Sequence, residues 1–219
     1  MTDKNPEKIR EMFDLIADSY DFINNIISFG THKRGKKLAV KNLEIPEGLK
    51  ILDLCTGTGD LAYFLSKRGR VTGLDFSSKM LAVARKKVPD AEFIEGDCTN
   101  LPFNNASFDV VTIGFGLRNI ENSDRAIEEI CRVLKPDGIF MHLDFSNANP
   151  FGDFVFEKFV PLLVKIFYGN TVPYKYLVQS KQEYFNPQKL KEKFESHGLK
   201  YVTQKFYALN MMCETVMKR

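Results

Sequence analysis

The sequence predicts an α/β domain built on a mostly parallel, seven-stranded sheet that ends in an antiparallel hairpin. From residue 50 onward, short apolar runs alternate with stretches of helical periodicity, which is the pattern of repeated βαβ units. Near the carboxyl end, the apolar runs 199–207 and 211–217 are joined too closely for a parallel crossover and must pair antiparallel. A length of 219 residues suits one domain, which we expect to cover 1–219.

The residues before the first strand are expected to form a helical lid over about 6–42. Apolar residues at three- and four-residue spacing predict an amphipathic helix over 6–28, broken near Ser19. Residues 32–42 are basic, and they fit either a solvated helix face or a surface attracted to anionic headgroups. Gly35 weakens a helix there by about 1 kcal/mol relative to alanine.

The elements of the sheet region follow in order. We expect parallel strands at 50–55, 70–75, 92–96, 108–113 and 138–145, and helices at 60–67, 77–87, 123–134 and 187–197. Ser123 is expected to be the N-cap of its helix. Residues 135–138, KPDG, are expected to stop that helix and form a turn.

An aromatic-rich insertion at about 150–177 interrupts this alternation before the last helix. A helix that spans a bilayer needs roughly 20 consecutive apolar residues. The apolar runs of this insertion are much shorter, because they are interrupted by Glu157, Lys158, Pro161 and Lys165. We therefore do not expect a transmembrane helix. Two interpretations stay open: a helical cap that completes the core, or an apolar wall for a large substrate that touches a membrane.

Composition excludes several classes of function. The net charge of +3 is too small to indicate nucleic-acid binding, and 27% charged residues with 44% hydrophobic ones describe a soluble globular protein. The four cysteines have no C-x-x-C spacing, so we expect neither a metal site nor disulfides. The amino terminus lacks the apolar core of a signal peptide, which predicts a cytoplasmic location.

The stretch Ile51 to Asp60, ILDLCTGTGD, predicts a nucleotide-cofactor site. It reads as a strand, a turn with Gly57 and Gly59, and the start of a helix. Glycine permits a sharp turn and the close approach of a ligand, and the following helix presents free N–H groups. Asp75 ends the next strand, where a carboxylate can accept both hydroxyls of a ribose.

Charge separates two cofactors that this turn could hold. The spacing also fits a dinucleotide, but Asp53 and Asp60 flank the turn and would repel a pyrophosphate. The same carboxylates suit S-adenosylmethionine, which carries an ammonium and a sulfonium. The simpler alternative is a glycine turn that only packs a helix on a strand.

Several stretches together resemble the C-methyltransferases of ubiquinone and menaquinone biosynthesis, the UbiE/MenG family. The resemblance covers nearly the whole chain, and its most specific parts are Tyr20-Asp21 with Asn24, SFGTH at 28–32 and FGLRN at 115–119. It implies a class I S-adenosylmethionine-dependent methyltransferase fold with a helical cap. The stretches that carry the resemblance are MFDLIADSYDFINNIISFGTH (12–32), LDLCTGTGDLA (52–62), GLDFSSKMLAVAR (73–85), EGDCTNLPFNNASFDVVTIGFGLRNI (95–120) and RVLKPDG (132–138).

Three residues depart from the family pattern. Gly35 stands where the family usually has tryptophan, Asp137 stands in place of a glycine, and Asp144 stands in place of a glutamate. These departures leave the sheet unaffected and bear on substrate entry and on the identity of the substrate.

The resemblance implies four catalytic candidates. Arg118, if it faces the cleft, would stabilise a developing phenolate, and Asn119 would orient the substrate hydroxyl. His32 would accept a proton or orient the substrate, and Tyr20 would cover the cofactor. A surface salt bridge for Arg118 and a structural role for His32 remain the alternatives. His142 and His197 are expected to be structural.

The expected cofactor contacts come from several strand ends. Asp97 would accept from the adenine amino group, and the N–H of Cys98 would meet a ring nitrogen. Thr58 and Gly114 would line the methionine part. Phe76 and Met80 would pack against the adenine or serve the core. With Asp53, Gly57, Gly59 and Asp75 these complete the predicted cofactor site, and no metal is expected.

The predicted reaction is methyl transfer from S-adenosylmethionine to a ring carbon of a reduced isoprenoid quinone precursor, such as demethylmenaquinol, with S-adenosylhomocysteine as the product. A methyltransferase for another small or lipid acceptor is the main alternative; an NAD-dependent oxidoreductase and a non-catalytic binding module are less favoured. The expected partner is an isoprenoid quinol and not nucleic acid. Peripheral membrane contact and a homodimer are left open.

Overall fold

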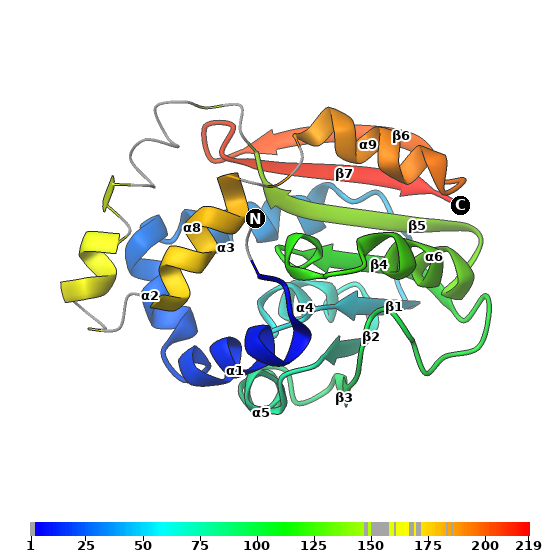
Figure 1. Cartoon of the computed structure of the whole chain (residues 1–219). Helices are drawn as coiled ribbons and strands as arrows, with labels where there is room; N and C mark the ends of the chain where they lie inside the picture. The colour runs from blue at the N-terminus through cyan, green and yellow to red at the C-terminus, as the bar shows by residue number, and fades with distance from the viewer. Residues whose placement is uncertain are drawn as a thin grey trace.

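A seven-stranded sheet forms the centre of the protein (Figure 1), with the order β3-β2-β1-β4-β5-β7-β6. The computed structural model describes residues 3–146, 149, 158–159, 161–166, 169, 172–182, 184 and 186–219. The strands are β1 (Leu49–Leu54), β2 (Gly69–Asp75), β3 (Glu92–Glu95), β4 (Phe108–Gly114), β5 (Leu134–Phe145), β6 (Lys200–Tyr207) and β7 (Met212–Lys218). The predicted fold class is confirmed, including the terminal hairpin.

One strand, β7, runs opposite to the other six strands of the sheet. β1 to β5 pair parallel, whereas β7 pairs antiparallel with both β5 and β6. β1 lies between β2 and β4, so the chain crosses from one half of the sheet to the other beside β1. In open α/β sheets, ligands bind at such a switch point, outside the carboxyl ends of the strands.

Helices cover both faces of the sheet. One core contains apolar residues of α6 and α9, and the opposite core contains those of α3, α4 and α5. The helices are α1 (Pro6–Ile16), α2 (Tyr20–Ser28), α3 (Thr31–Asn42), α4 (Asp60–Leu65), α5 (Ser78–Lys87), η1 (Leu117–Asn119), α6 (Ser123–Val133), α8 (Val172–Gln182) and α9 (Pro187–Ser196). No helix within these described ranges is long and apolar enough to cross a bilayer.

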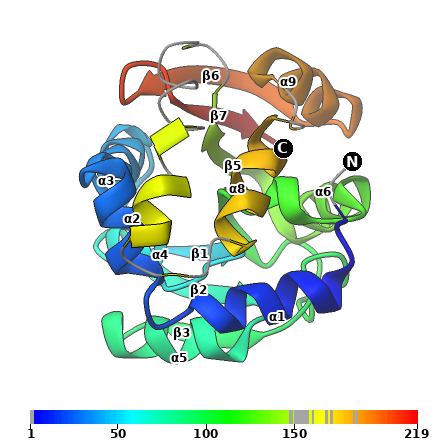
Figure 2. The same cartoon turned by 60° about the vertical axis from the view of Figure 1, so that its left-hand side comes forward.

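The N-terminal helices lie at the end of the sheet that carries the carboxyl termini of the parallel strands (Figure 2). The predicted break near Ser19 is confirmed, because α1 ends at Ile16 and α2 begins at Tyr20. Ile16 and Ile23 pack in a small core with Met80 of α5, Val164 and Leu177. α1 and α2 therefore contact both the main domain and the described parts of the 150–177 region.

Two local predictions were wrong. Asn122, and not Ser123, is the N-cap of α6, since its side chain accepts a hydrogen bond from the backbone N–H of Arg125. The predicted helix stop before residues 135–138 is confirmed, because α6 ends at Val133, but these residues form no separate turn, because β5 already begins at Leu134 and its register with β4 shifts between Phe108 and Val110. The irregularity is a bulge inside the strand pair.

Two of the three departures from the family pattern have a local explanation. Asp137 has a φ of 62°, a left-handed conformation that glycine adopts freely and aspartate tolerates. Gly35 is buried in α3, where an added Cβ would lie 2.6 Å from Met212 Cε. A larger residue at position 35 therefore requires Met212 to move.

Only part of the 150–177 insertion can be compared with its prediction. Residues 161–166 and 172–182 are helical, and Val164 and Leu177 are buried against α1 and α2. Phe151, Phe154, Phe156 and Phe167 lie outside the described residues.

Candidate active site

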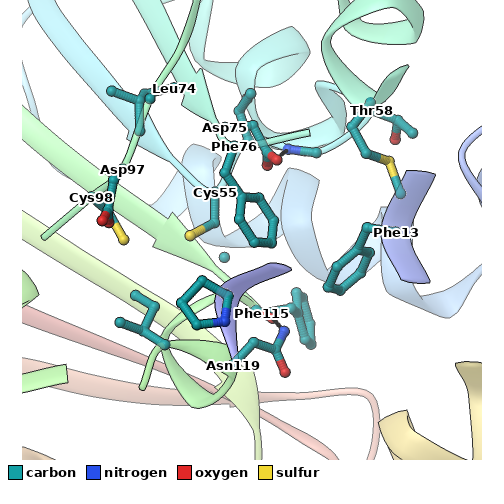
Figure 3. A pocket seen from close by; sticks show the side chains of 18 of the residues that line it. Phe13, Cys55, Thr58, Leu74, Asp75, Phe76, Asp97, Cys98, Phe115 and Asn119 are labelled. Atoms are coloured by element: carbon teal, nitrogen blue, oxygen red, sulfur yellow. Dashed lines mark hydrogen bonds between the residues drawn. The ribbon is translucent and has the colours of Figure 1, made fainter. Parts of the chain in front are cut away.

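A cavity of about 300 Å³ opens at the carboxyl ends of β1 to β4 (Figure 3). Residues at the carboxyl ends of four strands line it: Cys55 to Thr58 after β1, Asp75 and Phe76 at the end of β2, Asp97 and Cys98 after β3, and Phe115 after β4. The topological switch point of the sheet therefore lies at this cavity.

The glycine turn forms one wall of the cavity. Gly57 and Gly59 have φ values of 55° and 78°, so both occupy the left-handed region. An added Cβ at Gly59 would lie 3.1 Å from the Cβ of Ala84, whereas one at Gly57 would meet no atom within 4 Å. Gly59 therefore permits close helix packing, and Gly57 leaves open space in which a ligand can approach the backbone.

Asp75 lies at the end of β2 and is buried. One carboxylate oxygen accepts a hydrogen bond from the Gly57 N–H at 2.8 Å, and the other accepts one from the Ser77 N–H at 2.9 Å. Burial raises its pKa to about 6. Each oxygen retains a lone pair, so the side chain can accept two ligand hydroxyls, as predicted for a ribose.

Asp53 lies beneath the turn and does not line the cavity. Its oxygens accept hydrogen bonds from the hydroxyls of Thr56 and Thr112, both at 2.6 Å. Burial raises its pKa to about 6. The described contacts of Asp53 hold the turn in place.

Asp60 lines the cavity and lies within a cluster of basic groups. Lys36 Nζ is 3.2 Å from Asp60 Oδ2, Lys87 Nζ is 2.6 Å from Oδ1, and His32 Nε2 is 3.6 Å from Oδ2. Burial opposes ionisation, but these neighbours outweigh it and hold the pKa of Asp60 well below its usual range. The negative charge that the sequence placed beside the turn is therefore largely balanced by the protein.

Among the residues predicted to contact the adenine, Asp97 and Cys98 lie side by side at one end of the cavity (Figure 3). Phe76, Met80, Asp97 and Cys98 all line it. The Asp97 carboxylate accepts hydrogen bonds from the backbone N–H and the hydroxyl of Thr99, both at 2.8 Å. Met80 is fully buried in the core beneath α1, so it combines packing with a lining position.

Tyr20, Gly114, Phe115 and Asn119 line the other end, near Thr58 and Asp60. Asn119 Oδ1 accepts a hydrogen bond from the Tyr176 hydroxyl of α8 at 3.3 Å. Burial raises the pKa of Tyr20, so its phenol is a neutral hydrogen-bond donor at physiological pH. Two of the four catalytic candidates, Tyr20 and Asn119, therefore face the cavity.

Arg118 is buried and does not line the cavity. Its Nη1 donates to Asp144 Oδ1 at 2.6 Å and to the Phe115 carbonyl at 2.8 Å. The guanidinium lies 5.1 Å from the ring centroid of Phe145. Arg118 thus supports the lining residue Phe115 from below, in a buried ion pair with a residue that departs from the family pattern.

His32 also lies behind the cavity wall. Its Nδ1 is 2.6 Å from Ser28 Oγ, and burial lowers its pKa. His142, expected to be structural, is buried in β5 with Nε2 3.2 Å from the Tyr184 hydroxyl, and burial lowers its pKa to about 3. Both rings are neutral at physiological pH.

The structure adds site residues that the sequence reasoning missed. Lys36 and Phe13 line the cavity, and Asp21 accepts a hydrogen bond from the Thr58 hydroxyl at 2.6 Å. Lys36 follows His32 by four residues, so helical spacing alone places both on one face of α3. No local sequence pattern indicated the contact between Asp21 and Thr58, because the two residues are 37 positions apart in the chain.

Among the described residues, no three His, Cys, Asp or Glu side chains are grouped so that they could hold a metal ion. The four cysteines are free thiols. The described side chains that line the cavity supply carboxylates, one ammonium, a phenol, amides, hydroxyls, thiols and aromatic rings.

Known proteins resemble this chain in sequence over almost its whole length. Residues 1–217 match the model of the ubiE/COQ5 methyltransferase family. A demethylmenaquinone methyltransferase of Lactobacillus johnsonii is 41% identical over 92% of this chain and 89% of its own length. The enzyme of the same name from Lysinibacillus sphaericus is 38% identical, with 95% and 94% covered.

Solved structures share the fold. A SAM-dependent methyltransferase from Thermotoga maritima superposes with a TM-score of 0.73 at 19% identity, covering 96% of this chain and 99% of that one. One from Aquifex aeolicus gives a TM-score of 0.67 at 16% identity, with 90% and 97% covered. At these identities the likeness concerns the fold alone.

Proposed function

The chain belongs to the ubiE/COQ5 methyltransferase family and is an S-adenosylmethionine-dependent methyltransferase, and from this premise we propose that its acceptor is a reduced isoprenoid quinone precursor, demethylmenaquinol. The relatives that carry this activity in their names match almost the full chain. The expected reaction moves a methyl group to a ring carbon of the quinol.

The main support from the geometry is a single cavity that joins a buried carboxylate at the end of β2 to an open glycine turn. Asp75 offers acceptors for the ribose hydroxyls, and Asp97 offers acceptors for the adenine amino group. Gly57 leaves space for close approach, and Phe13 and Phe76 supply apolar surface at the cavity wall. These donor and acceptor types fit the cofactor, which supplies an electrophilic methyl group when bound.

Carbon methylation requires that the acceptor carbon be held in line with the methyl group at roughly 3 to 3.5 Å. Phe115 and Tyr20 present ring surface and a phenol at the end of the cavity opposite Asp97. The Asn119 amide can donate to an acceptor oxygen, while its Oδ1 accepts from Tyr176. We assign to these three residues the orientation of the quinol ring.

Arg118 acts from beneath this end of the cavity in our proposal. It fixes the Phe115 carbonyl and brings a positive charge under the site at which the quinol oxygen gains negative charge. Its ion pair with Asp144 keeps the guanidinium in one orientation. Arg118 is therefore proposed as a positioning residue with an electrostatic contribution.

We also propose peripheral contact with a membrane through the outer side of α2. Phe22 and Phe29 are 59% and 85% exposed, and the helical segment 161–166, which packs on α1 and α2 through Val164, exposes Leu162 and Ile166. Arg34 and Lys37 of α3 are exposed close by in the chain. Apolar side chains beside basic ones suit an anionic lipid surface, from which a quinol with a long tail would enter.

A homodimer through the edge strand β6 is a further proposal. Tyr201, Val202 and Phe206 are partly exposed on this strand, which ends the sheet. Sedimentation at several concentrations would detect such a dimer, and a monomer at all of them would contradict it.

The proposed function is tested by turnover with defined acceptors. The purified protein, S-adenosylmethionine and chemically reduced demethylmenaquinone should yield menaquinol, identified by mass spectrometry, and the oxidised quinone should yield none. Product from a benzoquinol or an unrelated lipid, with none from the naphthoquinol, would overturn the choice of acceptor. The Asp75→Ala variant is the control for cofactor dependence.

A further inference from the structure

Lys36 supplies the positive charge among the described residues that line the cavity. The other charged lining residues are Asp60, Asp75, Asp97 and Glu121. The ammonium of Lys36 lies 3.2 Å from Asp60 Oδ2 and 5.7 Å from the ring centroid of Phe115. Only 13% of the side chain is exposed. A cation this buried beside a cavity is rarely without a ligand or partner.

The position of Lys36 along the cavity follows from the order of the strands. β3 carries Asp97 at one end, β2 carries Asp75, and β1 and β4 carry the turn and Gly114 at the other end. A ligand with adenine near Asp97 and ribose at Asp75 extends next toward Thr58, Asp60 and Lys36. The part of S-adenosylmethionine beyond the ribose is the methionyl group, which ends in an ammonium and a carboxylate.

Asp60 does not depend on Lys36 for charge balance. Lys87 Nζ lies 2.6 Å from Asp60 Oδ1, whereas Lys36 lies against the other oxygen. Lys87 also contacts Asp21 and does not line the cavity. An ammonium has three donors, so Lys36 can donate to a ligand while it keeps its contact with Asp60.

We propose that Lys36 and Asp60 form a subsite for the zwitterionic amino-acid end of the cofactor, in which Lys36 binds the carboxylate and Asp60 accepts from the ammonium. The pair presents opposite charges at one end of the cavity, which matches the two charges of an α-amino acid. This inference rests on the proposed function for the identity of the cofactor, but it requires no acceptor.

The test compares two ligands that differ only in the carboxylate. Affinities for S-adenosylhomocysteine and for its decarboxylated analogue are measured by calorimetry with wild-type protein, Lys36→Met, Lys36→Arg and Lys37→Met. Wild-type protein should bind S-adenosylhomocysteine about ten- to a hundredfold more tightly, the range expected for hydrogen bonds to a charged group. Lys36→Met should remove this preference by weakening only S-adenosylhomocysteine, while Lys36→Arg should retain most of it.

Lys37→Met is the matched control, because Lys37 is the exposed neighbour on the same helix and should keep the wild-type preference. Equal loss of both ligands in Lys36→Met, or no preference in the wild-type protein, would overturn the subsite. Unchanged affinities with lower turnover would also overturn it and would assign Lys36 to the acceptor. Absence of any binding by the wild-type protein would instead contradict the proposed function.

Discussion

Two buried carboxylates with the same shifted pKa have different surroundings in this protein. Burial raises the pKa of both Asp53 and Asp75 to about 6. The Asp53 carboxylate accepts hydrogen bonds from two threonine hydroxyls and does not line the cavity, whereas Asp75 faces the cavity. Only the titration of Asp75 should therefore affect the cofactor directly.

Cofactor affinity should depend on pH through Asp75. The ionised carboxylate accepts from the ribose hydroxyls, and protonation removes an acceptor, so affinity for S-adenosylhomocysteine should fall as pH drops below about 6 and level off above 7. Asp75→Asn should bind more weakly by about 1.5 to 3 kcal/mol at neutral pH, with a flatter profile. Calorimetry from pH 5 to 8 measures this. Asp53→Asn should keep the pH dependence; its loss there would transfer the effect to Asp53.

The pair formed by Arg118 and Asp144 is the other informative contact between single residues. Both side chains are almost completely buried, at 3% and 1% exposed. A buried charge is tolerated when it is paired and hydrogen-bonded, and breaking such a pair leaves the other charge uncompensated. Arg118 should therefore affect folding as well as catalysis.

Replacing Arg118 should separate these two effects. Arg118→Ala should lower the free energy of unfolding by about 3 kcal/mol and reduce kcat by roughly a hundredfold at saturating cofactor. Urea titration and steady-state kinetics measure the two quantities. The double variant Arg118→Ala with Asp144→Ala should regain stability without regaining kcat. Wild-type kcat in a folded Arg118→Ala protein would leave Arg118 with a structural role alone.

At the scale of elements, the N-terminal helices are fixed to the wall of the cavity by polar contacts as well as by apolar packing. Asp14 of α1 accepts from the Ser77 hydroxyl at 2.5 Å, beside Asp75. Asp21 of α2 contacts Thr58 in the turn and Lys87 of α5. α1 and α2 therefore close the cavity from the side that the sheet leaves open.

The outer side of α2 should bind anionic vesicles. Phe22→Ser with Phe29→Ser should reduce co-sedimentation with phosphatidylglycerol vesicles severalfold, because each aromatic ring loses apolar burial in the lipid interface. Val202→Ser is the control: Val202 is 51% exposed on β6, near the paired residues Lys200 and Lys218 at the opposite end of the sheet. Equal binding by the double variant and the wild-type protein would contradict a membrane role for α2.

At the scale of the whole molecule, the cavity joins elements from both halves of the chain. Its lining extends from Pro6 in α1 to Asn122 before α6 and includes residues that follow β1 to β4. Tyr176 of α8 reaches the same site through Asn119. Ligand binding should therefore stabilise the protein as one unit.

Thermal unfolding should distinguish the two cofactors that share the glycine turn. S-adenosylhomocysteine at a hundred times its Kd should add about 2.7 kcal/mol to the free energy of unfolding, whereas NAD at the same concentration should leave Tm unchanged. Asp75→Ala should need more S-adenosylhomocysteine for the same rise in Tm. A rise in Tm with NAD comparable to that with S-adenosylhomocysteine would contradict the assignment of the site.

Local sequence determined the elements and the location of the site. Periodicity placed the strands and helices, and the spacing from the glycine turn to Asp75 placed the cavity, because these features depend on neighbours along the chain. The sequence determined helix and strand ends less well. Ser123 was predicted as the N-cap of α6, but the N-cap is Asn122, whose side chain accepts the hydrogen bond from the backbone N–H of Arg125.

Tertiary structure alone decided what each charged residue does. Asp53 and Asp60 flank one turn in the sequence, yet Asp53 is turned to Thr112 on β4 and Asp60 faces the cavity beside Lys36, Lys87 and His32. For Arg118 the sequence left open a place in the cleft or a surface salt bridge, and the side chain instead forms a buried pair with Asp144, 26 positions away. Such pairings depend on how distant segments meet after folding, and the free energy of a charge depends on its burial and its neighbours, neither of which a local pattern contains.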